Sequence, residues 1–131
     1  MRVDSHCHLD FPDFVDDLDA IVARADDAGI KRIVTISTRV RRLGGLLAIT
    51  ARFPDVYCSV GTHPHNADKE LHIQTDDLVR LSAHPRCVAI GEAGLDNFYA
   101  NAPREAQATG LLRDIAAPRL TGLPRVRHHP K

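Results

Sequence analysis

Short apolar runs alternate with amphipathic segments along the chain, and this alternation is the feature that most limits the possible folds. Runs typical of buried strands recur five times, at Met1–His6, Arg32–Ser37, Val56–Gly61, Cys87–Gly91 and Leu123–His128. Strands that are joined by helices are expected to be parallel and to form right-handed βαβ units. The pattern therefore predicts an α/β protein, with either an open doubly wound sheet or part of a barrel.

Segments with helical periodicity lie between these runs: Phe14–Ala25 with a stop at Gly29, Val40–Phe53, a segment from a cap at Thr75 or Asp76 to His84, and one that begins at Pro103. Gly44 and Gly45 weaken the second helix, each by up to about 1 kcal/mol relative to alanine. Residues 111–131 fit less well, because Pro118 interrupts the fourth helix and two arginines occupy a strand expected to be buried.

Size and composition exclude several classes of protein. The 131 residues fit a single domain, 1–131, whereas a complete eight-stranded α/β barrel usually needs about 250 residues. Lys and Arg total 17 and so do Asp and Glu, so no global positive field attracts nucleic acid, and any affinity for phosphate must be local. Three cysteines, and no apolar stretch long enough for a leader or a membrane span, indicate a reducing cytoplasm.

Histidines occur in pairs where predicted strands end. His6 and His8 flank Cys7 at the end of the first strand, and alternation along a strand points both side chains to one side. Two neutral imidazoles on one side can bind one metal ion, and a polar strand end with solvated histidines is the alternative. His63 and His65 follow the third strand, and exposed loop histidines are the alternative there.

A carboxylate is predicted at the same edge of the sheet. Glu92 lies in Gly91–Asp96 after the fourth strand, and the carboxyl ends of parallel strands meet at one edge, where sites form in barrels and open sheets. Glu and His together suit Zn²⁺ or Mn²⁺. The other interpretation is that Glu92 pairs with an arginine such as Arg104. His128 closes the fifth predicted strand and would face the same edge.

Three motifs in this order resemble the TatD-type metal-dependent deoxyribonuclease family, within the amidohydrolase-like group of hydrolases. They are DSHCHLD at Asp4–Asp10, GTHPHNA at Gly61–Ala67, and AIGEAGLD at Ala89–Asp96 followed by REAQ at Arg104–Gln107. The resemblance implies a TIM-type barrel whose site hydrolyses phosphodiester bonds in DNA with two divalent metal ions, Mg²⁺, Mn²⁺ or Zn²⁺. This chain would supply about five of the eight strands, with residues 111–131 matching poorly.

The resemblance also implies roles for individual residues. His6 and His8 would bind one metal ion, Glu92 would bridge both, and His128 would bind the second. His63 would hold a substrate phosphate and act with Glu92 in catalysis, with His65 as a further substrate contact. Two cations in such a site can hold the scissile phosphate and lower the pKa of a bound water.

The chain also departs from the family pattern. Family members have further strands that supply another histidine and an aspartate, so we expect this chain to be incomplete and weakly active or inactive. A non-enzymatic remnant that binds one metal ion, and another hydrolase of the same superfamily, are the alternative functions. The unpaired edges of the first and fifth strands favour self-association.

Overall fold

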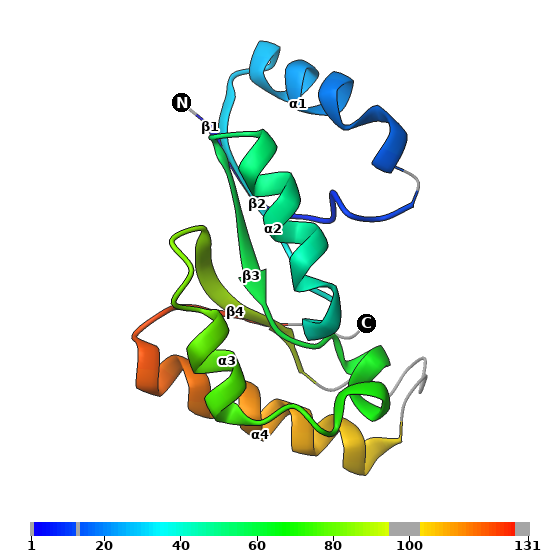
Figure 1. The fold of residues 1–131 in the computed structure, drawn as a ribbon, viewed down its shortest axis with the longest axis vertical. Helices are drawn as coiled ribbons and strands as arrows, with labels where there is room; N and C mark the ends of the chain where they lie inside the picture. Colours follow the sequence, from blue (N-terminus) through cyan, green and yellow to red (C-terminus); the bar gives the residue numbers. More distant parts are fainter. Residues whose placement is uncertain (1, 13, 95–102, 128–131) are drawn as a thin grey trace.

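Five parallel strands form one sheet with helices between them (Figure 1). The computed structural model describes residues 2–12, 14–94 and 103–127. Its strands lie in the order β1-β2-β3-β4-β5, which is also their order in the sequence. The strands are β1 (Arg2–Cys7), β2 (Ile30–Thr35), β3 (Val56–Val60), β4 (Cys87–Ala93) and β5 (Arg125–Arg127). Each predicted strand is present, and no strand end differs from its predicted position by more than two residues.

The helices follow the predicted order with altered ends. They are α1 (Leu18–Asp27), α2 (Leu43–Arg52), α3 (Thr75–Leu81) and α4 (Arg104–Thr121), with 3-10 turns η1 (Val15–Asp17), η2 (Val40–Arg42) and η3 (Pro64–Glu70). The predicted cap of α3 at Thr75 or Asp76 is wrong, because the helix is capped at Gln74. The Gln74 backbone N–H donates to the Asp77 carboxylate at 2.8 Å, which fixes the start of the helix one residue earlier.

The sheet curls strongly, as a barrel requires. In a flat sheet, residues on β1 and β4 would lie about 14 Å apart, at about 4.8 Å per strand. His6 on β1 and Glu92 on β4 instead approach to 3.4 Å between side-chain atoms. The carboxyl ends of the strands therefore converge on one point, and the five strands form half of a barrel.

Helices cover the outer face of this half-barrel and supply most of the core (Figure 1). One cluster joins α2, α3 and α4 to β3 and β4, with Leu46, Leu78 and Ile90 fully buried. A second joins α1 and α2 to β2 and β3 around Ile33 and Val56. Because the apolar core lies on the outer face of the sheet, polar side chains occupy the inner face at the carboxyl ends of the strands.

Helix α4 continues through Pro118 and ends in a glycine cap. The Gly122 N–H donates to the Pro118 carbonyl at 2.8 Å, and Gly122 has φ 75°, the left-handed conformation that glycine adopts without strain. A proline one turn from the end of the helix is therefore accommodated. Arg125 and Arg127 are exposed on β5, so the strand expected to be buried on both faces is open to solvent on the side of its arginines.

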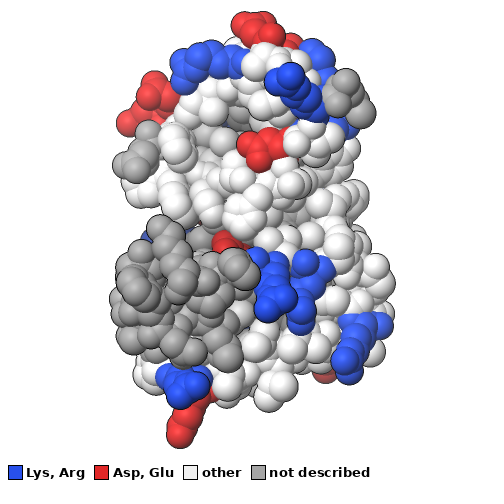
Figure 2. Space-filling model, turned by 180° about the vertical axis from the view of Figure 1, so that it is seen from behind, with Lys and Arg blue, Asp and Glu red and all other residues white. Residues whose placement is uncertain are grey.

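The surface carries mixed charge. Figure 2 shows Lys and Arg side chains in separate groups on one face, with uncharged residues over most of the surface between them. This distribution matches the equal totals of basic and acidic residues. Within the described ranges, no helix is long and apolar enough to cross a membrane.

Candidate metal centre

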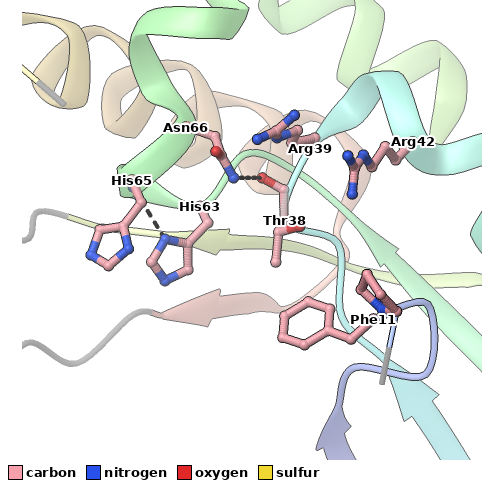
Figure 3. A pocket seen from close by; sticks show the side chains of 8 residues that line it. Phe11, Thr38, Arg39, Arg42, His63, His65 and Asn66 are labelled. Atoms are coloured by element: carbon pink, nitrogen blue, oxygen red, sulfur yellow. Dashed lines mark hydrogen bonds between the residues drawn. The ribbon is translucent and has the colours of Figure 1, made fainter. Parts of the chain in front are cut away.

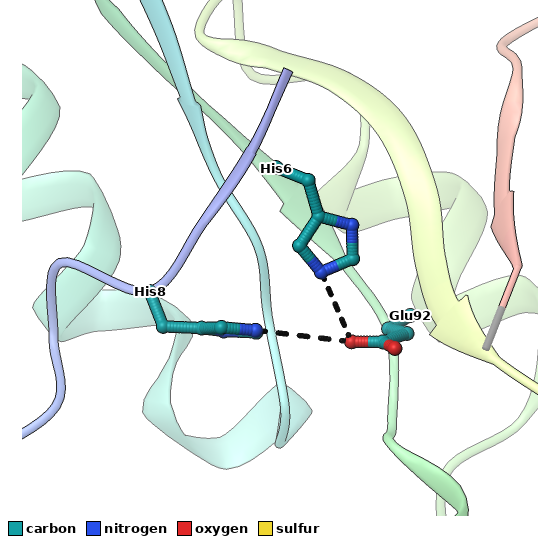
Figure 4. Close-up of side chains that lie close together, drawn as sticks. All are labelled: His6, His8 and Glu92. Atoms are coloured by element: carbon teal, nitrogen blue, oxygen red, sulfur yellow. Dashed lines mark ion pairs between the residues drawn. The ribbon is translucent and has the colours of Figure 1, made fainter. Parts of the chain in front are cut away.

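His6, His8 and Glu92 converge at the carboxyl end of the sheet (Figure 4). His6 Nε2 lies 3.4 Å from Glu92 Oε1, and His8 Nε2 lies 3.9 Å from the same oxygen. The two imidazole rings meet edge to face, with centroids 5.2 Å apart. The sequence prediction that both histidines project to one side is confirmed by this arrangement, and Glu92 comes from a strand three positions away.

The three donor atoms have the spacing of ligands to one cation. All lie within 4.8 Å of one another. Two ligands that bind zinc tetrahedrally at about 2.1 Å lie about 3.4 Å apart, so small side-chain movements bring the whole set to bonding distance. Two imidazoles and one carboxylate form a donor set that Zn²⁺ or Mn²⁺ accepts. The residues therefore fit a divalent metal ion.

The backbone fixes the orientation of His8. Its Nδ1 lies 3.2 Å from the Ile36 carbonyl, which can only accept a hydrogen bond, so Nδ1 carries the proton. Nε2 then has a free lone pair directed towards Glu92. Metal-binding histidines commonly donate their second ring N–H to a carbonyl in this way, which locks both the tautomer and the ring plane.

A ladder of buried hydroxyl groups positions Glu92. The Ser59 hydroxyl donates to the Gly91 carbonyl at 2.7 Å, and the Ser37 hydroxyl donates to the Gly61 carbonyl at 2.7 Å. The Glu92 N–H donates to the Ser37 carbonyl at 3.2 Å. Gly61 and Gly91 pack so closely that a Cβ on Gly61 would lie 2.7 Å from the Gly91 Cα. The strand ends therefore approach closely enough to hold Glu92, which is 6% exposed.

The second oxygen of Glu92 faces a third histidine. His63 Nε2 lies 3.9 Å from Glu92 Oε2, whereas His6 and His8 approach Oε1. His63 caps η3, and its Nδ1 accepts the His65 backbone N–H at 3.1 Å. In the neutral ring the proton must then lie on Nε2. His63 therefore presents an N–H donor to the centre, which suits an anionic oxygen and does not suit a metal ion.

His65 lies next to His63 and lines a pocket beside the centre (Figure 3). The rings of His63 and His65 meet edge to face, with centroids 4.5 Å apart. The pocket has a volume of about 380 Å³, and Arg39, Arg42 and Phe11 contribute to its other walls. Both histidines therefore face a cavity rather than bulk solvent alone.

Burial raises the pKa of two groups beside the histidine pair. The pKa of the Cys7 thiol rises to about 12, mainly through loss of solvation and further through the charges of Asp4 and Asp10. Burial also raises the pKa of Asp10, against the opposing effects of its own backbone N–H, His8 and Arg42. The Cys7 thiol is directed to the Val34 carbonyl at 3.5 Å, and it is not part of the group of donor atoms that converge at Glu92.

Four of the six histidine and glutamate positions that the sequence singled out meet at one place. His6, His8, His63 and Glu92 make the direct contacts, and His65 is linked to them through His63. His128 lies outside the described residues. The alternative partner for Glu92, an arginine such as Arg104, is not needed to explain its burial, because three imidazoles surround the carboxylate.

Sequence reasoning missed a buried polar network behind His63. The Glu70 side chain is fully buried and accepts the N–H groups of Val40 and Arg41 at 2.7 and 2.9 Å. The Thr62 hydroxyl donates to Glu70 Oε1 at 2.6 Å. Arg113 of α4 donates to the Thr62 hydroxyl at 2.9 Å and to the Glu70 carbonyl at 3.0 Å. The network ties η2, η3 and α4 to the residue that precedes His63.

One signal in the sequence could have revealed Arg113. It shares a face of α4 with Ala106, Gly110 and Ala117, at spacings of three and four residues, and all four are buried. An arginine among small residues on a buried face needs a buried partner. Leu112, an apolar residue of the same helix, is by contrast 68% exposed.

Comparisons with known proteins place these residues in context. The family model described as TatD related DNase matches residues 3–131. The uncharacterized metal-dependent hydrolase YjjV of Escherichia coli (strain K12) is 31% identical over 128 residues, which cover 96% of this chain and 49% of that protein. The 3'-5' ssDNA/RNA exonuclease TatD of Salmonella typhimurium is 34% identical over 95 residues, which cover 72% of this chain and 36% of that protein.

A solved structure of a TatD homologue also resembles this chain. The crystal structure of YjjV, a TatD homologue from Escherichia coli K12, matches with a TM-score of 0.88 at 29% identity, over 99% of this chain and 51% of that one. The predicted fold class, a TIM-type half-barrel of parallel strands, is confirmed by this likeness. The chain spans about half the length of the relatives it matches most fully.

Proposed function

The chain belongs to the TatD related DNase family, and from this we propose that its metal centre hydrolyses phosphodiester bonds in DNA. The observation that carries the proposal is the convergence of His6, His8 and Glu92 on one point, with the N–H donor of His63 beside them. A hydrolytic metal site needs ligands for the cation and a separate donor for the anionic substrate. These four side chains have the chemistry for both tasks.

We assign His6 and His8 to one divalent ion and Glu92 to a bridge between two. His6 and His8 both approach Oε1, so Oε2 is turned away from the first ion, and the bridging role itself follows from the family resemblance. His128 would complete the second ion, an assignment that rests on its position in the sequence. When bound, the two cations would stabilise the charge of the scissile phosphate and lower the pKa of an attacking water.

His63 and His65 would bind the substrate. The proton on His63 Nε2 would donate to a phosphate oxygen, while the His65 backbone N–H holds the ring in place through Nδ1. His65 lines the adjoining pocket and would contact the next part of the substrate. A curated relative named as an exonuclease of single-stranded DNA and RNA supports a nucleic acid as the substrate class.

A cleavage assay tests this proposal. After treatment with a chelator, the chain is incubated with a labelled DNA oligonucleotide, with and without Mg²⁺ or Mn²⁺. We expect the metal to restore weak cleavage and His6→Ala to abolish it. His72→Ala removes an exposed histidine away from the centre and serves as the matched control. Cleavage that persists in His6→Ala, or metal binding without any cleavage, would rule out hydrolysis by this centre.

The same fold supports a second proposal, self-association through sheet edges. Within the described residues, β1 pairs only with β2, and β5 pairs only with β4. Val3 on β1 is 53% exposed, and an open edge with an exposed apolar residue favours pairing with another chain. Sedimentation at micromolar concentration should show dimers that Val3→Lys weakens. A monomer over the whole concentration range would refute self-association.

A further inference from the structure

The pocket beside the metal centre has the chemistry of an anion receptor. Arg39, just before η2, and Arg42 of η2 lie on one side, His63 and His65 on another, and Phe11 opposite the arginines (Figure 3). Its volume of about 380 Å³ falls at the lower end of the range for small-molecule sites. It is therefore large enough for one phosphate together with part of a sugar or base.

The guanidinium groups of the two arginines in this pocket have no hydrogen-bond or ion-pair partner among the described residues. By contrast, a carboxylate pairs with each of Arg32, Arg41, Arg52 and Arg80. The charge of Arg42 lowers the pKa of Asp10, but the two side chains form no ion pair among the described residues. Two unpaired guanidinium groups facing one cavity can bind an anion with charge-assisted hydrogen bonds.

Hydrogen bonds to the backbone fix the position of the two arginines relative to the metal centre. Glu70 accepts the N–H groups at the start of η2, and the Thr38 carbonyl accepts the His63 N–H at 2.9 Å. Asn66 also donates its side-chain amide to the Thr38 carbonyl, at 3.2 Å. The segment that carries the arginines is thus bonded directly to the one that carries His63.

Phe11 joins the pocket to the metal ligands from the other side. Its ring stacks on His8 with centroids 4.6 Å apart and planes 11° apart, and it remains 38% exposed. One wall of the pocket therefore offers a flat apolar surface suited to a base or a sugar, and single-stranded nucleic acids bind to such surfaces. The opposite wall offers positive charge.

We propose that this pocket binds a second phosphate of the substrate through Arg39 and Arg42, next to the scissile phosphate that the metal ions and His63 would hold. The inference rests on the proposed function for the identity of the substrate. It assigns to these residues the recognition of a nucleotide unit beyond the scissile bond. A chain of nucleotides would therefore bind better than an isolated phosphodiester, although the net charge of the protein is zero.

Binding in the absence of metal tests the pocket separately from catalysis. The probe is a fluorescein-labelled oligothymidylate of about twelve nucleotides, measured by anisotropy with EDTA present. We expect Arg39→Gln/Arg42→Gln to weaken binding about tenfold or more. Because one phosphate contact is lost, the log–log slope of the salt dependence should fall by about 0.7, the value per phosphate on single strands. Arg52→Gln/Arg80→Gln makes the same change in net charge elsewhere and should alter affinity less than threefold.

The outcomes separate this inference from the proposed function. An equal loss of affinity in both double variants would overturn the pocket assignment, whatever the metal centre does. A selective loss would support it even if the chain cleaves nothing. Amide shifts of the wild-type chain with the same oligothymidylate provide a measurement without variants: changes concentrated at Phe11, Thr38, Arg39 and Asn66 support the pocket, and changes concentrated on α3 or β5 refute it.

Discussion

Replacing Glu70 with alanine is expected to lower the free energy of unfolding by about 3–5 kcal/mol, the cost of breaking a buried charged network by removing one partner. Glu70 is fully buried and accepts three hydrogen bonds, from two backbone N–H groups and the Thr62 hydroxyl. Its removal leaves those three donors without their acceptor, whereas Arg113 keeps its bonds to the Glu70 backbone carbonyl and the Thr62 hydroxyl. Because domains are stable by only about 5–15 kcal/mol, much of the chain would unfold at 37 °C.

Urea denaturation followed by circular dichroism measures this effect. Glu70→Gln keeps the shape of the side chain but turns an amide NH₂ towards backbone donors, so we expect an intermediate loss. Asp19→Ala removes one partner of the exposed pair with Arg52 and should change stability by less than about 1 kcal/mol. If Glu70→Ala proved no more destabilising than Asp19→Ala, the network would not stabilise the fold.

Glu92→Gln is expected to weaken the binding of Mn²⁺ or Zn²⁺ more than about 100-fold, because changes to groups that only orient the ligands already cost 10–100-fold. The amide retains the size of the carboxylate but not its charge, and Glu92 is the only acidic member of the described ligand group. Its neighbours His6 and His8 would be left as two neutral donors. Activity with DNA should fall with metal affinity.

Isothermal titration with Mn²⁺ measures this change directly. Glu105→Gln alters an exposed glutamate at the start of α4 and is the matched control, with unchanged affinity. Thermal melting shows whether Glu92→Gln remains folded. Equal metal affinity in the wild type and Glu92→Gln would show that the metal binds elsewhere.

The half-barrel was predictable because its signals are local. The parallel sheet follows from apolar runs such as Val56–Val60 separated by helical segments, and each of these features is visible within a few residues. The meeting of His6, His8 and Glu92 was predictable for a related reason, since the ends of parallel strands share one edge. The sheet curls enough to bring β1 into contact with β4. This curl depends on the whole sheet, so no local sequence pattern predicts it.

The remaining features depend on distant partners. Glu70 has the local appearance of a solvated glutamate, and it is buried because α4 brings Arg113 to Thr62 from 51 residues away. Arg39 and Arg42 also resemble surface arginines, and their importance emerges only when the fold places Phe11 and His63 around them. When the role of a side chain depends on tertiary contacts, a single sequence gives little indication of it.

Anomalous diffraction from crystals grown with Mn²⁺ or Zn²⁺ tests the central claim most directly. The account predicts an anomalous peak about 2.1 Å from His6 Nε2, His8 Nε2 and Glu92 Oε1, which disappears in Glu92→Gln. A peak at other residues, or no peak at a metal concentration that supports DNA cleavage, would contradict the assignment of these three side chains as the metal centre.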